Sequence, residues 1–292
     1  MVLASLLFAL MGLCVKLASA HYGAGEIVLY RGAVGALLMA GVALARGGSM
    51  RTRVPAMHFW RSLTGVCALC LWFYSIGQLP LATAVTLNYM SSVWMALFLI
   101  GGAIALGGAR IDARLVCTVL VGFAGVAMVL QPAIERDQFW GGLAGLMSGV
   151  LAAMAYLQVT ALGRAGEPEY RVVFYFSLGG VAAGALLASV TGGLHGHSFE
   201  GIALLGTVGL LATTAQWMIT RAYGAGTTLV NASLQYTGIA WSFIFGVLWF
   251  DDPVTWLALA GMVLIAGAGV AATRLRRSAG QADGANSAVV ES

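Results

Sequence analysis

Polar and aromatic side chains interrupt two long apolar stretches of this 292-residue sequence at matching places. Residues 86–98 read TLNYMSSVWMALF and residues 233–245 read SLQYTGIAWSFIF, so Asn88 and Tyr89 correspond to Gln235 and Tyr236. An amide donates and accepts hydrogen bonds without a charge, and tyrosine adds an aromatic ring and a hydroxyl. This chemistry suits the binding of a small amphipathic molecule inside a membrane.

The elements that position these groups are expected to be transmembrane helices. The sequence is 60% hydrophobic and 9% charged, and apolar stretches long enough to cross a bilayer as helix recur along it. We place them at residues 2–20, 25–45, 57–78, 81–106, 113–131, 139–162, 171–191, 200–223, 227–250 and 254–273. Prolines support these boundaries because they break helix interiors, and they fall at Pro55, Pro80, Pro132, Pro168 and Pro253. We therefore predict an all-α integral membrane protein with ten transmembrane helices.

An internal repeat divides the chain into two halves. The two opening stretches lie 147 residues apart, and FAGVA at 123–127 resembles GAGVA at 267–271. An odd number of spans in each half forces the halves into opposite orientations, which is the inverted-repeat design of secondary transporters. We expect inverted five-helix repeats at residues 1–131 and 139–277 around a central cavity, followed by a disordered cytoplasmic tail at 278–292.

The basic residues predict the orientation. If both termini are cytoplasmic, twelve of the 15 cations, Arg61 among them, lie at inner helix ends or loops, and only Arg136 lies in an outer loop. Lys16 and Arg31 fall inside predicted spans. We expect a multi-pass protein of the inner (plasma) membrane whose net charge of +4 reflects topology and not nucleic-acid binding.

Helical spacing gathers the polar residues of each half on one face. Positions three or four apart share a face, which collects Asn88 with Ser91, and Asn231 with Gln235 and Ser242. Such a face either lines a cavity or forms hydrogen bonds to neighbouring helices. We favour the cavity, and predict that substrate is bound by Asn88, Tyr89, Ser91, Asn231, Gln235, Tyr236 and Ser242, together with Trp72, Tyr74, Gln78, Tyr156, Gln216, Trp217 and Thr220 from other spans.

Two cations inside predicted spans each have a functional and a structural interpretation. Lys16 either meets a substrate carboxylate or snorkels to the membrane surface, and we include it among the predicted substrate-binding residues. Arg31 is expected to pair with Glu26 or with a helix end.

The sequence offers no catalytic or metal-binding motif. Asp251 and Asp252 fit a turn before the helix that Pro253 begins, and His195 and His197 lack partners at ligand spacing. There is no HExxH, Walker loop or nucleophile elbow. We therefore expect no cofactor, no metal and no enzymatic activity, although a membrane-embedded enzyme and a passive channel remain alternatives to a transporter.

Together, Lys16 in the first helix, Arg31 in the second, the FAGVA and GAGVA ends and the two five-span halves resemble the drug/metabolite transporter superfamily, specifically its EamA-like ten-helix exporters. The resemblance implies a basket of helices with the third, fourth, eighth and ninth lining a cavity, and export of small metabolites. The chain has Gly107-Gly108-Ala109-Arg110 where the family often has an acidic residue. We expect a secondary exporter of small amphipathic metabolites, foremost aromatic or apolar amino acids, that works by alternating access as a monomer.

Overall fold

The computed structural model describes residues 1–105, 113–130, 139–226, 228–251, 255–257, 259–268, 270–271 and 274. The predictions for Gly107 to Arg110, for Pro132, Arg136 and Asp252, and for the tail at 278–292 lie outside these residues.

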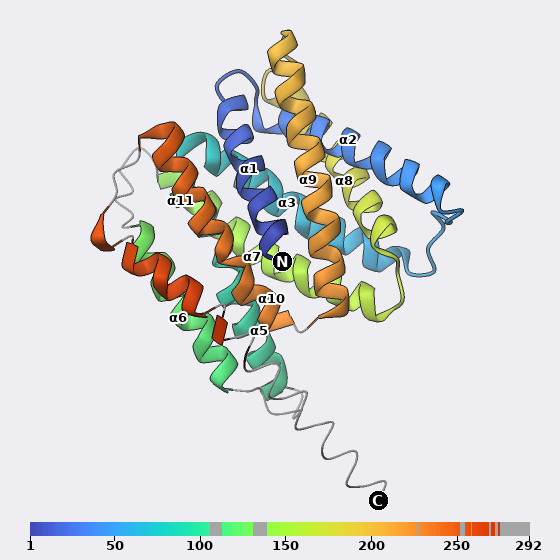
Figure 1. Cartoon of the computed structure of the whole chain (residues 1–292). Helices are drawn as coiled ribbons and strands as arrows, with labels where there is room; N and C mark the ends of the chain where they lie inside the picture. The colour runs from blue at the N-terminus through green and yellow to red at the C-terminus, as the bar shows by residue number, and fades with distance from the viewer. Residues whose placement is uncertain are drawn as a thin grey trace, which may run out of the picture.

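The regular elements of the described residues are helices (Figure 1). Their bounds are α1 Val2–Ala18, α2 Ala24–Ala45, α3 Pro55–Gln78, α4 Leu81–Tyr89, α5 Ser91–Ala105, α6 Ala113–Leu130, α7 Phe139–Arg164, α8 Glu169–Val190, α9 Phe199–Ala225, α10 Thr228–Gln235 and α11 Thr237–Phe250. A further apolar helix covers Leu259–Ala268. By length and composition, α2, α3, α7, α8 and α9 can each cross a membrane, and α1 is a shorter apolar helix.

The two apolar stretches that carry the polar residues are each broken into two helices. The predicted 81–106 stretch is interrupted at Met90, between α4 and α5, and the predicted 227–250 stretch at Tyr236, between α10 and α11. At both places the chain continues through a tighter turn, with Val93 N donating to Met90 O at 2.9 Å and Ile239 N donating to Tyr236 O at 3.0 Å. Side chains on either side of a break therefore no longer follow the face rule of a continuous helix.

The helices pack in pairs that join the two halves of the chain. Helices α1 to α6 belong to the first half of the chain and α7 to α11 to the second. Helix α2 packs along α8, α3 along α7, α1 along α9 and α4 against α11. The breaks themselves lie inside the bundle, where Tyr89 and Tyr236 are 2% and 0% exposed.

Small residues allow close contacts along α7, where Gly141, Gly145 and Gly149 share one face. A Cβ atom on Gly149 would lie 2.6 Å from the Leu87 carbonyl oxygen, and one on Gly145 would lie 2.7 Å from Ser75 Oγ. The backbone of α7 thus lies directly against α3 and α4, which places the polar end of α4 beside α7.

Two glutamates join loops and helices at opposite ends of the bundle. Glu167, between α7 and α8, contacts His58 Nε2 at 2.9 Å, Arg171 Nη1 at 3.0 Å and Thr52 Oγ1 at 2.9 Å. Burial raises the pKa of Glu167, but these hydrogen bonds outweigh it and hold the pKa below its ordinary value. At the other end, Glu26 contacts His195 Nδ1 at 2.8 Å.

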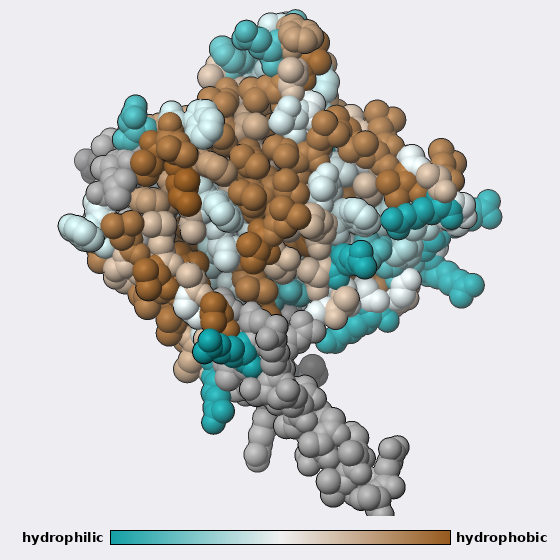
Figure 2. Space-filling model, in the orientation of Figure 1, coloured by the Kyte–Doolittle hydropathy of each residue, from teal (hydrophilic) through white to brown (hydrophobic). Residues whose placement is uncertain are grey.

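Apolar side chains cover the middle of the face seen in Figure 2, and hydrophilic residues gather towards its edges. Exposed apolar residues such as Leu37, Leu186 and Val263 contribute to the apolar surface of the bundle. A soluble protein rarely exposes so much apolar area, so this surface is suited to contact with lipid.

Candidate functional site

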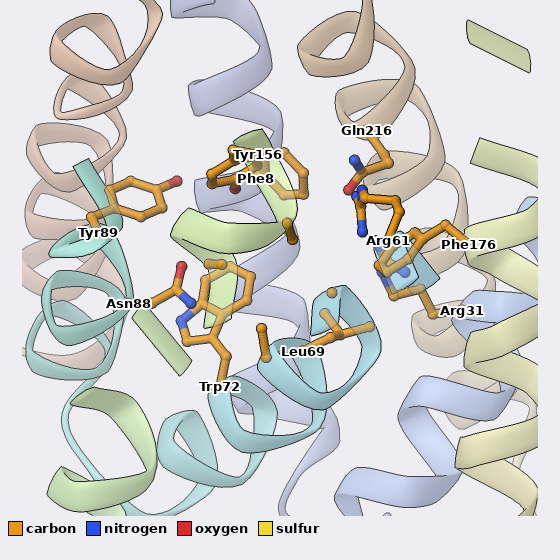
Figure 3. Close-up of a pocket in the computed structure, with 14 residues that line it drawn as sticks. Phe8, Arg31, Arg61, Leu69, Trp72, Asn88, Tyr89, Tyr156, Phe176 and Gln216 are labelled. Carbon is orange, nitrogen blue, oxygen red and sulfur yellow. The ribbon is translucent and has the colours of Figure 1, made fainter. Parts of the chain in front are cut away.

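A cavity lies at the centre of the bundle, between helices of both halves. Its larger or polar lining residues are Phe8, Arg31, Arg61, Leu69, Trp72, Asn88, Tyr89, Tyr156, Phe176 and Gln216 (Figure 3). In that view, Asn88, Tyr89 and Trp72 lie at one end, Phe8 and Tyr156 lie between, and the remaining polar residues lie at the other end. Aromatic rings, amides and charged groups therefore surround one space.

The last turn of α4 supplies the amide and the phenol at the first end of the cavity. Asn88 Nδ2 donates to Ser148 Oγ on α7 at 3.0 Å. Tyr89 packs against α11 at Gly238, where an added Cβ would lie 2.8 Å from the tyrosine hydroxyl oxygen. The break at Met90 ends α4 so that both side chains reach the cavity wall.

Tyr156 forms the middle of the wall and is positioned by two buried partners. Its ring stacks on that of Tyr223 with centroids 5.0 Å apart and an interplanar angle of 6°. Gln235 Nε2 donates to the Tyr156 hydroxyl at 3.1 Å, and Gln235 Oε1 accepts from the Tyr223 hydroxyl at 3.1 Å. Gln235 therefore acts on the cavity through Tyr156, because it does not line the cavity itself.

Two arginines at the far end are the main departure from the sequence-based interpretation. Arg31 is 4% exposed and Arg61 is 2% exposed, and both line the cavity. The expected pairing of Arg31 with Glu26 is wrong, because Glu26 contacts His195 and His197. The placement of Arg61 at an inner helix end did not indicate that its side chain is buried on the cavity wall. Its position six residues after Pro55, about 9 Å into α3, was the available signal of burial.

Five of the predicted binding residues are brought together on the cavity wall, namely Trp72, Asn88, Tyr89, Tyr156 and Gln216. Tyr74 and Gln78 lie in a separate hollow beside the α1–α2 turn. The reason is geometric, since Tyr74 stands two positions from Trp72 and points about 200° away around α3. In the same way Trp217, next to Gln216, faces Arg46, whose guanidinium carbon lies 5.6 Å from the ring centroid of Trp217.

The remaining predicted residues of the second half and Ser91 do not line the central cavity. Asn231 Nδ2 donates to the Ala222 carbonyl at 2.6 Å, and Ser242 Oγ donates to the Gly238 carbonyl of its own helix at 2.9 Å. Thr220 lines a hollow between α7 and α9, while Ser91 and Tyr236 are fully buried. Their contact with substrate stays a prediction.

Lys16 has partners at the end of α3. Its Nζ donates to the Ile76 carbonyl at 2.9 Å and to the Leu79 carbonyl at 2.6 Å. These are last-turn carbonyls that lack partners within the helix, and a cation is favoured there by the helix dipole. The structure thus gives Lys16 a capping use, and its contact with a substrate carboxylate stays a prediction.

The described residues hold no group of three or more His, Cys, Asp or Glu side chains that could bind a metal ion. Asp251 ends α11 in the left-handed conformation with φ 53°, in keeping with the predicted turn. The cavity instead combines hydrogen-bond donors with apolar rings. Such a lining can recognise a small molecule that has both an apolar part and acceptor groups.

Comparison with known proteins identifies related transporters. The model of the EamA-like transporter family matches residues 1–131. A Pseudomonas aeruginosa protein named a pseudopaline exporter is 34% identical over 288 residues, which is 94% of this chain and 95% of that protein. A Rhizobium johnstonii protein named a riboflavin transporter is 26% identical over 78% of this chain and 74% of its own length. A solved crystal structure matches this chain with a TM-score of 0.77 and 21% sequence identity. The match covers 94% of this chain and 96% of that chain, which shows a shared fold.

Proposed function

Because the chain belongs to the EamA-like transporter family, we propose that it is a secondary exporter of small amphipathic metabolites that bind in the central cavity. The observation that carries this proposal is the cavity itself, which joins Asn88, Tyr89 and Tyr156 with two arginines between the halves of the chain. The relatives named as a pseudopaline exporter and a riboflavin transporter support a small organic substrate.

The proposed mechanism is alternating access by ten spans in two inverted five-helix repeats. Packing between the halves supports this mechanism, because corresponding helices of the two halves make corresponding contacts. Helix α3 packs along α7 as α1 packs along α9, and α2 packs along its counterpart α8. Two halves that make equivalent contacts can exchange conformations and open a central site to each side in turn.

The proposed substrates carry a carboxylate and an apolar group, with aromatic or apolar amino acids as the first class to test. A guanidinium binds a carboxylate through two parallel hydrogen bonds, and the rings of Phe8, Trp72 and Tyr156 offer apolar contact. The amide of Asn88 can accept from or donate to the same molecule. No nucleotide-binding motif occurs in the sequence, so we propose that a solute or proton gradient drives export.

We further propose that the protein lies in the inner membrane with both termini in the cytoplasm. Support comes from Arg46, Arg51, Arg53 and Arg164, which are exposed where α2 leads to α3 and α7 leads to α8. In bundles of this kind such basic loops face the cytoplasm. A reporter fused after Arg277 should read as cytoplasmic, and a periplasmic reading would contradict both the orientation and the inverted repeat.

The test is efflux from liposomes that contain the purified protein. Vesicles loaded with labelled phenylalanine, leucine, glutamate, pseudopaline or riboflavin are followed with and without a pH gradient. We expect saturable efflux of at least one compound and counterflow from the opposite side. No efflux of any compound would contradict the exporter, and efflux that never saturates would favour a channel.

Two amide variants make the test specific for the cavity. Asn88→Ala should weaken transport several-fold, because loss of one hydrogen bond to substrate costs about 1 kcal/mol. Gln78→Ala is the matched control, since this amide is exposed in a separate hollow. Equal effects of the two variants would place the substrate elsewhere.

A further inference from the structure

Two guanidinium groups share one aromatic ring at the far end of the cavity. The guanidinium carbon of Arg31 on α2 lies 5.2 Å from the centroid of the Phe176 ring, and that of Arg61 on α3 lies 4.3 Å from it. Both side chains are more than nine-tenths buried. Two positive charges are thereby concentrated on one wall of a cavity inside the bundle (Figure 3).

Within the described part of the chain, neither guanidinium has a carboxylate partner. The buried glutamates are used elsewhere, because Glu26 pairs with His195, and Glu167 pairs with His58 and Arg171. Contact with Phe176 compensates only a small part of the cost of two buried cations, since a cation–π contact is weak beside the cost of burying a charge. The cavity therefore carries uncompensated positive charge.

The unpartnered polar atoms of the wall are all donors. Among the described lining residues, the buried nitrogen and oxygen atoms without a hydrogen-bond partner are Arg31 Nε, Arg61 Nε, Arg61 Nη1, Trp72 Nε1 and Gln216 Nε2. Buried N–H groups without acceptors are costly, and they are rare unless a ligand or water satisfies them. A ligand rich in acceptor oxygens would satisfy this set.

Gly65 keeps the Arg61 guanidinium at the cavity. It lies one helical turn after Arg61, and an added Cβ would collide with Arg61 Nη1. The guanidinium folds along α3 through the space that the missing side chain leaves. A larger residue at this position would displace the charge without removing it.

Resting on the exporter function above, we propose that the substrate is a dianion with two carboxylates, which bind Arg31 and Arg61 while its apolar part contacts the rings of the cavity. One carboxylate neutralises one guanidinium and leaves the second charge without a partner. An amino acid zwitterion would also bring its ammonium group near that second charge, where like charges repel. Two carboxylates match both charges, and each guanidinium presents a planar fork of donors to one of them.

The experiment measures binding of three probes that share a phenyl ring to the purified full chain. Phenylsuccinate has two carboxylates, 3-phenylpropionate has one, and phenylalanine is a zwitterion. We expect phenylsuccinate to bind about tenfold more tightly than either of the others, because a hydrogen bond to a charged group is among the strongest in proteins. Arg31→Gln and Arg61→Gln should each abolish this preference, and Arg46→Gln, an exposed arginine at the end of α2, should retain it.

The melting temperature of the ligand-free protein distinguishes loss of recognition from loss of the fold. Removal of one of two unpartnered buried charges should leave the melting temperature of the ligand-free protein unchanged or raised. Gly65→Ala gives an independent variant that retains both arginines, and it should reduce the preference for phenylsuccinate. A lower melting temperature in both Arg→Gln variants would show structural arginines and overturn the proposal.

The result also separates this proposal from the exporter function. If wild-type protein exports phenylalanine and shows no preference for phenylsuccinate, the dianion proposal is wrong and the exporter stands. If phenylsuccinate binds with the expected preference but no probe crosses the membrane, the recognition stands and the exporter function fails.

Discussion

The two broken helices begin from similar sequences and end in different environments. In the first half, Asn88 and Tyr89 close α4 and line the cavity. In the second half, their counterparts Gln235 and Tyr236 are 1% and 0% exposed and lie in a packed seam, where Gln235 binds Tyr156 and Tyr223. Both stretches break at or next to the corresponding tyrosines, and the neighbouring helices decide what each amide does.

The neighbours differ at each tyrosine. Tyr89 packs against Gly238 with its other side towards the cavity, whereas the ring of Tyr236 packs against Gly122 of α6. Similar residues thus line the cavity in one half and pack in a buried seam in the other.

Alanine substitution of Gln235 and of Asn88 should give the largest difference in folding stability between the two regions. Gln235→Ala deprives the buried Tyr223 hydroxyl and the half-buried Tyr156 hydroxyl of a partner and should cost about 2–4 kcal/mol of folding stability. Asn88→Ala should cost only about 1 kcal/mol, because Ser148 Oγ retains its bond to the Gly145 carbonyl. Melting temperatures in detergent measure the stability loss of each variant. Equal losses would contradict the assignment of Gln235 to a packed seam and Asn88 to the cavity wall.

Alanine substitution of Gly122 and Gly238 should give a smaller difference in stability, again with the larger loss in the seam around Tyr236. A Cβ on Gly122 would lie 2.6 Å from ring atoms of Tyr236, which is enclosed, so Gly122→Ala should destabilise by about 1–3 kcal/mol. Gly238→Ala presses on the free end of Tyr89, which can shift into the cavity, and should mainly change transport. A larger melting-temperature loss in Gly238→Ala than in Gly122→Ala would contradict this assignment.

The glutamates at the two ends extend the comparison and should give the smallest effect. Glu167→Gln should cost about 1 kcal/mol near neutral pH, and Glu26→Gln less, because the His195 side chain that it contacts is 51% exposed. The pKa of folded Glu167 lies below its ordinary value of 4.5, so its stabilisation is complete above that pH and is lost as the pH falls further. Melting curves of the wild type and Glu167→Gln should converge in acid, and a constant difference would refute this account.

Periodicity and composition predicted much of the helix pattern, because apolar length and proline position are local properties. The structure retains helices at each of the described predicted stretches, and adds the breaks at Met90 and Tyr236. The side of a helix that faces the cavity depends on its neighbours, which is why helical spacing did not separate Trp72, on the cavity wall, from Tyr74, in another hollow. The burial of Arg61 depends on Gly65 and Phe176, and no pattern along one helix shows the second of these.

The most direct test of the cavity as the binding site is an experimental structure of the protein with the compound that it exports best. The account predicts density for the compound between Asn88 and Tyr89 at one end and the two arginines at the other, with its carboxylate oxygens at Arg31 and Arg61. Density beside Gln235 at the second break, or in the hollow of Tyr74 and Gln78, would contradict it.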